Sequence, residues 1–250
     1  MKTAFSNAGP MRAAEIKVMI SGAFAAAYKQ LVPQFEAITG HKIETAYGPS
    51  MGDVPHAIPH RLERGEHADI VIIADSAVDA LINKGKVVTN GRFDLAESII
   101  GAAVREGTPK PDIGSVEALK KALLDAKSIA YSDSASGVYI SSQLFPRLGI
   151  LGQIKDKARM IPAEPVGEVV ARGEAELGFQ QISELKPIQG IEIVGPLPAE
   201  IQKITIFAAG LTANAKEPEA AKALIAFLSS EQAASTVRMT GMTPLTSASR

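Results

Sequence analysis

The sequence lacks cysteine and tryptophan entirely, and only 5% of its 250 residues are aromatic. Without cysteine, the chain can form no disulfide, bind no metal through thiolates and use no cysteine nucleophile. A composition without cysteine is compatible with a bacterial periplasmic protein, although it does not demonstrate export. Hydroxyl, amide, carboxylate and imidazole groups therefore remain as the chemistry available to this chain.

An excess of one charge is also missing, because 26 basic residues nearly balance 27 acidic residues for a formal net charge of -1. Proteins that bind nucleic acids or anionic membranes need a broad basic surface. We therefore expect no nucleic-acid partner. Any anion that the chain recognises must be held by local groups.

Long apolar runs are absent as well, since no stretch approaches the roughly 20 residues that span a membrane. Hydrophobic residues still make up 46% of the chain, which is enough for one large or two modest domains. Residues 1–14 lack the apolar centre of a signal peptide, so we interpret them as a leader or the trimmed start of a mature chain. We expect a globular monomer that does not span a membrane.

The sequence does contain a recurring unit, in which an apolar run is followed by a loop of small residues and a segment with helical periodicity. The runs IKVMI (16–20), KIETAY (42–47) and DIVIIA (69–74) each begin such a unit. Three successive units predict parallel strands joined by right-handed crossovers, which is an α/β fold. The same pattern returns with SIAY (128–131).

Two long apolar strands bracket the middle of the chain, at about 98–104 and 203–212. We interpret them as crossover strands that join two doubly wound α/β lobes. The predicted boundaries assign residues 15–98 and 209–250 to the first lobe and residues 99–208 to the second. A chain with this organisation encloses a cleft between its lobes.

Small, hydroxylic and amide-bearing residues follow the predicted strands of both lobes. Ligands bind beyond the carboxyl ends of strands in open α/β sheets, where backbone N–H groups and serine or glutamine side chains can hold an anion. In a single loop, such residues often serve only as turn and capping residues, but five such loops favour a ligand site. The candidate ligand-binding residues are Ser21, Gly22, Ser50, Met51, Ser134, Ser136, Gln180 and Gln181.

Two further motifs suggest other chemistry. GPSMG (48–52) matches the G-x-S-x-G nucleophile elbow of α/β-hydrolases, but that triad needs a later histidine, and all four histidines lie in the first third of the chain. His56 and His60 have the spacing of two metal ligands on one helical face. Pro55 and Pro59 flank them, and Glu63 is a possible third ligand but has no motif spacing, so we favour a solvated basic surface and predict no metal site. The same segment could instead supply cationic groups to a polyanionic ligand.

Several motifs resemble, in order, those of the type II periplasmic solute-binding proteins, especially the molybdate-binding branch of ABC importers. They are IKVMISGAFAAAYKQLVPQFEAITG, GPSMG, RLERGEHADIVIIADSAVDALINKGKV, GVYISSQLFPRLGI and GEAELGFQQISEL, and the resemblance covers residues 15 to about 245. This resemblance implies two lobes that close on a ligand, a periplasmic location and an ABC permease as partner.

The molybdate branch holds its oxyanion with two serines, backbone groups of the second lobe and a tyrosine hydroxyl. Carried over to this chain, the serine positions fall at Ala23 and Ser50, the backbone positions near Ser136 and Val166, and the tyrosine position at Gln181. Ala23 has no hydroxyl, and Gln181 replaces the tyrosine. Because a site built from hydrogen-bond donors discriminates strongly when they change, we expect an organic carboxylate or polycarboxylate rather than molybdate.

The combination of GPSMG, AIPHRLERGE and YSDSASGVYIS resembles a subgroup of this fold that includes bacterial aconitate isomerase. That resemblance implies a proton shift between allylic carbons beside carboxylates, which needs a positioned acid and base and no cofactor. Asp133, Tyr139, Glu168 and the histidines are the candidate proton carriers. Among them, Asp133, His56 and Glu168 are the predicted catalytic residues.

Two functions therefore follow from the sequence. Our main expectation is a receptor that binds a small anion, because the resemblance is full-length and no enzymatic motif is present. A cofactor-independent isomerase on the same scaffold is the alternative. Asp133 is the residue that distinguishes them, because a lone carboxylate in an anion site is either a turned-away cap or the proton carrier of an enzyme.

Overall fold

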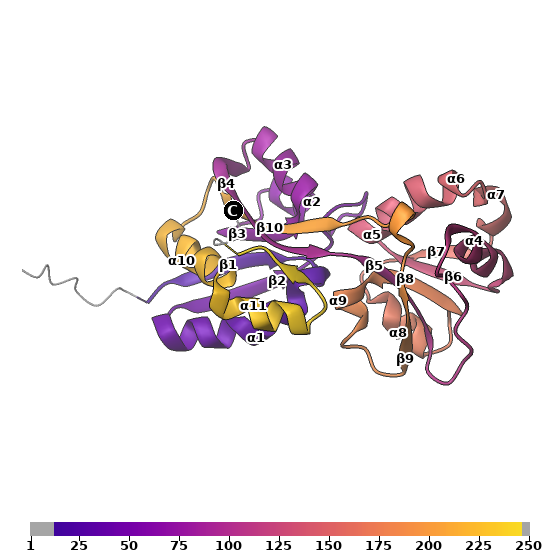
Figure 1. Ribbon diagram of the computed structural model, residues 1–250. Helices are drawn as coiled ribbons and strands as arrows, with labels where there is room; N and C mark the ends of the chain where they lie inside the picture. Colours follow the sequence, from indigo (N-terminus) through magenta and orange to yellow (C-terminus); the bar gives the residue numbers. More distant parts are fainter. Residues whose placement is uncertain (1–12, 247–250) are drawn as a thin grey trace, which may run out of the picture.

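The computed structural model describes residues 13–246 and folds them into two α/β lobes that lie side by side (Figure 1). Most of the predicted leader, residues 1–12, lies outside the described residues. The first lobe begins with β1 (Glu15–Ile20), α1 (Gly22–Thr39), β2 (Lys42–Tyr47), α2 (Ile58–Glu63), β3 (Ile70–Ala74), α3 (Asp75–Asn83) and β4 (Val87–Ser98). The C-terminal part returns to this lobe as β10 (Thr205–Thr212), α10 (Pro218–Leu228), α11 (Glu231–Met239) and β11 (Thr243–Pro244).

The first lobe is built on a six-stranded mixed sheet with the order β11-β4-β10-β3-β1-β2. β1 pairs in parallel with β2 and β3, whereas β10 runs antiparallel to β3 and β4. Helices cover both faces, with α1, α10 and α11 packed around Phe24 and Leu224, and α2 and α3 packed around Ile58 and Val78. This double cover explains why β3 is an uninterrupted apolar run that is buried along its whole length.

The second lobe is built on a five-stranded mixed sheet with the order β7-β6-β8-β5-β9. Its elements are β5 (Ile100–Arg105), α4 (Val116–Asp125), β6 (Ile129–Ser132), α5 (Ala135–Tyr139), the π-helical turn η1 (Ile140–Leu144), α6 (Phe145–Arg147), α7 (Leu151–Ile154), β7 (Ala158–Ile161), α8 (Val166–Ala171), β8 (Leu177–Gln181), α9 (Ile182–Leu185), β9 (Ile191–Pro196) and the short 3₁₀ turn η2 (Ala199–Ile201). β6 lies between β7 and β8 and is parallel to both. The carboxyl ends of β6 and β8 therefore point the same way.

Two connections join the lobes. β4 ends at Ser98 and β5 begins at Ile100, so the first connection is almost direct. The second runs past Gln202, whose side chain exchanges two 2.9 Å hydrogen bonds with the backbone of Ile100 and so ties the two connections together. β10 pairs with the first sheet from Thr205, so the predicted boundary at 208/209 falls inside this strand.

The predicted fold class, two α/β lobes joined by crossover strands, is confirmed by this arrangement. Within residues 13–246, no helix has both the length and the apolar character that a membrane crossing requires. The two sheets direct the loops after β1, β2, β6 and β8 toward the space between the lobes, and these loops supply the candidate site.

Candidate functional site

A cavity of about 400 Å³ lies between the two lobes. The first lobe contributes Gly22 after β1, Gly48 and Pro49 after β2, and His56 before α2. The second lobe contributes residues 132–134 after β6, residues 163–165 after β7, and Gln180 and Glu184 around the end of β8. The cavity therefore occupies the place where α/β sheets bind ligands, beyond the carboxyl ends of their strands.

Two predicted binding serines of the first lobe lie beneath this cavity rather than on its wall. Ser50 Oγ donates a hydrogen bond to Ser21 Oγ at 2.8 Å and accepts one from the Ala74 N–H at 3.0 Å. Ser21 Oγ in turn donates to the carbonyl of Ile72. These hydrogen bonds join the loops after β1 and β2 to β3. Ser21 and Ser50 are only 1% and 0% exposed, so neither hydroxyl faces the cavity.

The remaining first-lobe candidates divide in the same way. Gly22 is on the cavity wall, at the first position of α1. Ala23 is buried in the core beneath that helix, and Met51 packs against the hydrophobic cores on both faces of the first sheet. Only Gly22 among these three lines the cavity.

The serine-rich loop after β6 forms part of the opposite wall. Ser132 Oγ shares a 2.9 Å hydrogen bond with Ser136 Oγ and accepts one from the Gly137 N–H at 3.2 Å. Ser134 Oγ accepts a hydrogen bond from the Ser50 N–H at 3.0 Å, which joins the lobes. Ser132 and Ser134 line the cavity, whereas Ser136 lies behind them and is 1% exposed.

The two glutamines at the end of β8 face different surroundings. Gln180 Oε1 accepts a hydrogen bond from the Val166 N–H at 2.9 Å, and its Nε2 donates to Glu184 Oε1 at 3.0 Å. Gln181 instead faces the crossover, where its Oε1 accepts a hydrogen bond from Ser98 Oγ at 2.8 Å. Gln180 therefore lines the cavity, whereas Gln181 and Val166 do not.

His56 and Asp133, two of the predicted catalytic residues, meet across the cleft. His56 Nε2 lies 3.0 Å from Asp133 Oδ2, and the N–H of Ala163 donates to the same oxygen at 2.9 Å. The Asp133 side chain is 10% exposed and that of His56 is 39% exposed. An imidazole held at one nitrogen by a carboxylate can exchange a proton at the other, which makes this pair a candidate general base.

Glu184 is a cavity residue that the sequence analysis did not single out. It lies on α9, directly after β8, and packs between the lobes close to Gly22. Burial raises the pKa of the Glu184 carboxyl to about 8, and the charge of Asp133 contributes to the same shift. Its position just past a strand end is the same signal that identified Gln180 and Gln181.

The other charged candidates lie elsewhere. Glu168 is exposed on α8 and does not line the cavity. His60 contacts Glu63 at 3.4 Å, and Arg61 donates to the Tyr47 carbonyl at 2.9 Å, so neither faces His56 as part of a metal site. In the described part of the chain, no group of three or more histidine, aspartate and glutamate side chains could hold a metal ion.

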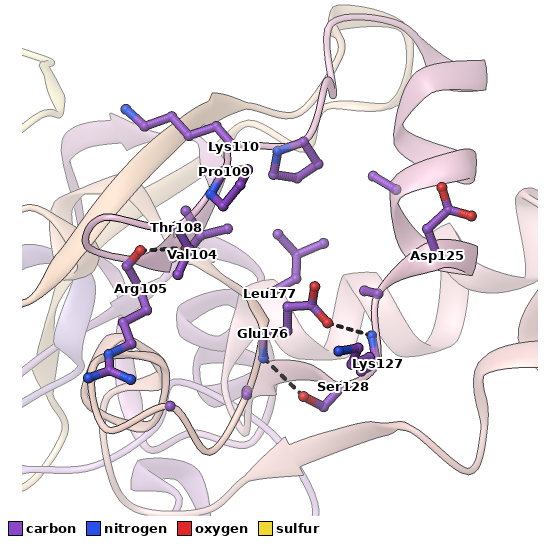
Figure 2. A pocket seen from close by; sticks show the side chains of 15 residues that line it. Val104, Arg105, Thr108, Pro109, Lys110, Asp125, Lys127, Ser128, Glu176 and Leu177 are labelled. Carbon is purple, nitrogen blue, oxygen red and sulfur yellow. Dashed lines mark hydrogen bonds between the residues drawn. The ribbon is translucent and has the colours of Figure 1, made fainter.

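A larger cavity of about 630 Å³ lies within the second lobe, among β5, α4 and β8 (Figure 2). Figure 2 shows that Glu176 anchors its wall, where the carboxylate accepts the Lys127 N–H at 2.7 Å and the Glu176 N–H donates to Ser128 Oγ at 3.0 Å. None of the predicted site residues lines this cavity. The smaller cavity between the lobes is therefore the better candidate, because it gathers paired titratable groups from both lobes.

Comparison with known proteins places the chain in a family. Residues 16–243 match the family described as bacterial extracellular solute-binding protein. The chain is 49% identical to aconitate isomerase from Pseudomonas sp. over 230 residues, covering 92% of this chain and 88% of that protein. It is 28% identical to the molybdate-binding protein ModA of Azotobacter vinelandii over 244 residues, covering 92% and 90%. The structure of the sulfate-binding protein SubI from Mycobacterium tuberculosis H37Rv aligns with a TM-score of 0.74 at 17% identity, covering 94% and 88%, which shows the fold.

These similarities confirm the resemblance to the molybdate-binding branch and the type II periplasmic binding protein fold. They also overturn our main functional expectation. The interpretation of the chain as a receptor that only binds a small anion is wrong, because a 49% identical relative over nearly the whole chain is an isomerase. The chain belongs to the bacterial extracellular solute-binding protein family, in the branch that resembles the molybdate-binding proteins.

Proposed function

We propose that this protein is an aconitate isomerase that interconverts trans- and cis-aconitate in the cavity between its lobes. The observation that carries the proposal is the 49% identity to the Pseudomonas aconitate isomerase across 92% of the chain. The fold by itself supports no such choice, because one fold serves many functions and a function must be argued from its site. The residues on the cavity wall supply that second line of support.

The reaction is a proton shift within an allylic system. A base removes a proton from the methylene carbon, the double bond moves by one position, and a proton is added to the carbon that was vinylic. No electron is gained or lost, so the chemistry requires only proton carriers and groups that stabilise the charge on the flanking carboxylates.

His56 is the proposed base in this reaction, and Asp133 is the residue that positions it. The 3.0 Å contact between His56 Nε2 and Asp133 Oδ2 fixes the orientation of the imidazole. Asp133 is itself held by the N–H of Ala163 at 2.9 Å. The proposed catalytic role of Glu168 is not supported, since its exposed side chain does not line the cavity.

The carboxylates of the substrate have to be bound mainly by neutral donors. None of the described residues on the cavity wall is a lysine or an arginine. The wall instead offers Gly22 at the start of the 18-residue helix α1, the hydroxyls of Ser132 and Ser134, and the amide of Gln180. Backbone N–H groups at a helix N-terminus carry partial positive charge and bind carboxylates well.

We further propose a periplasmic location, which is supported by membership of an extracellular solute-binding family. An ABC permease as partner remains a prediction from the sequence. The proposed isomerase activity does not require one. A small unsaturated tricarboxylate is the proposed ligand, in line with the expected preference for an organic polycarboxylate.

The test is to incubate the purified protein with trans-aconitate or cis-aconitate and follow both isomers by proton NMR. We expect either isomer to yield the same equilibrium mixture. The variant Asp133→Asn should lower kcat by about 100-fold or more, while Glu106→Gln, in the exposed turn after β5, should match the wild type. No interconversion above background at saturating substrate would refute the proposed function.

A further inference from the structure

We propose that Glu184 is the acid of this reaction, which delivers a proton to the allylic carbon opposite the one from which His56 removes a proton. This inference rests on the proposed function and adds a second catalytic residue to it. His56 belongs to the first lobe and Glu184 to the second, and both line the cavity between the lobes. Each lobe would thus supply one of the two proton carriers.

The orientation of the Glu184 carboxyl is set by Gln180. The Val166 N–H donates to Gln180 Oε1 at 2.9 Å, which fixes which end of the amide faces Glu184. Gln180 Nε2 then donates to Glu184 Oε1 at 3.0 Å. Because Oε1 is occupied as an acceptor, the acidic proton is assigned to Oε2 of this cavity-lining side chain.

Gly22 provides the space for this carboxyl. A Cβ atom on residue 22 would lie 1.9 Å from Glu184 Oε1 and 2.8 Å from its carboxyl carbon, far inside van der Waals contact. The carboxyl therefore lies directly against the first turn of α1. This close approach places the carboxyl at the boundary between the two lobes, beside the cavity that both line.

The charges around the cavity favour a neutral Glu184. The other titratable groups on the cavity wall are Tyr47, His56, Asp133 and Glu164. Among them, Asp133 is the carboxylate whose charge acts on the Glu184 carboxyl. Burial and that charge together raise the pKa of Glu184 to about 8. An acid whose pKa lies near the working pH can both release a proton and recover it within each turnover.

The proposed step balances without any further reactant. In one direction, His56 takes a proton from the methylene carbon, the electron pair moves through the allylic system, and the Glu184 carboxyl protonates the far carbon. His56 then releases its proton to solvent, and Glu184 takes one up. In the other direction the two residues exchange roles, with the Glu184 carboxylate as base and the protonated His56 as acid.

The test compares the wild type with the Glu184→Gln variant in D₂O, using each aconitate isomer separately. Glutamine preserves the shape of the side chain but transfers no proton, so kcat for isomerisation should fall by about 100-fold or more. His56 should still remove a proton from the isomer whose methylene faces it, and its 39% exposed side chain allows exchange with solvent. Deuterium should therefore enter the unreacted methylene of one isomer and not the other.

Several controls make the outcomes decisive. Tricarballylate, a saturated analogue, should protect the Glu184→Gln variant from thermal unfolding as it protects the wild type, which shows an intact site. Glu184→Asp keeps the acid but moves it by one methylene, so kcat should fall by roughly 10-fold to 100-fold while both isomers still exchange. This second variant provides the test if Glu184→Gln fails to fold.

Three results would overturn the assignment. The first is a Glu184→Gln variant that isomerises within about threefold of the wild type. The second is a folded variant that binds tricarballylate but exchanges neither isomer, which would make Glu184 a structural support of the site. The third is wild-type protein that binds aconitate without turnover, which would refute the proposed function and the role of Glu184 with it.

Discussion

The glutamine substitution at Glu184 also predicts a change in stability whose direction depends on pH. In the folded chain, burial raises the pKa of this carboxyl from its ordinary value of 4.5 to about 8. Between these values, the unfolded chain has released a proton that the folded chain still holds, so raising the pH favours unfolding by about 1.4 kcal/mol per pH unit. The loss is absent below pH 4.5 and complete above pH 8.

The magnitude follows from the two pKa values. At pH 7, the wild type is expected to have lost about 3 kcal/mol through Glu184, and above pH 8 the loss levels at about 5 kcal/mol. Glutamine cannot ionise, so Glu184→Gln should escape this loss. For a protein of this size, about 3 kcal/mol corresponds to a rise in Tm of roughly 6–12 °C at pH 7.

The assay is urea and thermal unfolding of the wild type, Glu184→Gln and Glu106→Gln at pH 5, 7 and 8.5. The difference in unfolding free energy between the wild type and Glu184→Gln should widen with pH, whereas Glu106→Gln should follow the wild type throughout. A difference that stays constant from pH 5 to pH 8.5 would refute the reasoning. It would mean that the Glu184 carboxyl ionises in the folded protein as it does in water.

Three further substitutions test the contacts that shape the site and the fold. Gly22→Ala should displace the Glu184 carboxyl, because the added methyl group would lie 1.9 Å from Oε1. We expect kcat for aconitate to fall at least tenfold while the circular dichroism spectrum is unchanged. Full activity would contradict the close packing of Glu184 against Gly22. Ser50→Ala should lower the free energy of unfolding by about 1–3 kcal/mol, measured in urea, since it leaves the Ala74 N–H without its acceptor; a neutral result would show that water replaces the hydroxyl. Asp69→Ala should lower the free energy of unfolding in urea by about 3–5 kcal/mol, because the buried carboxylate accepts hydrogen bonds from three backbone N–H groups. A decrease below about 1 kcal/mol would disprove that role of the carboxylate.

The fold was accessible from the sequence because its signals are local and repeated. The apolar runs at 16–20 and 69–74 became β1 and β3, and buried strands covered on both faces have to be apolar throughout. The second crossover strand, predicted at about 203–212, is β10 at Thr205–Thr212. The lobe boundary at 208/209 stays a prediction, because an apolar run does not reveal which sheet each of its residues joins, and Thr205 already pairs with the first sheet.

The positions of the site residues depend on side-chain direction, which the sequence does not encode locally. Ser50 and Ser134 both follow strands, yet the hydroxyl of Ser50 is used inside its own lobe and only Ser134 lines the cavity. Glu168 and Glu184 are both glutamates on short helices of the second lobe, α8 and α9. Glu168 is exposed, whereas Glu184 is packed against Gly22 of the other lobe, a contact between residues far apart in the sequence.

The choice of function was wrong for a related reason. We favoured a receptor because the chain carries no enzymatic motif. A proton shift without metal or cofactor needs only ordinary carboxyl and imidazole groups, and these groups have no characteristic spacing when they come from different lobes. His56 and Asp133 are 77 positions apart in the sequence and 3.0 Å apart in space.

That pairing has a consequence for the timing of catalysis. The imidazole of His56 gains its carboxylate partner only while the two lobes are together, and the Ser50 N–H finds Ser134 Oγ under the same condition. A molecule whose lobes have separated still carries every residue of the site but has no assembled base. If the protein has the proposed isomerase activity, closure of the lobes around the substrate would have to precede proton abstraction, so that the same motion would both hold the ligand and assemble the base.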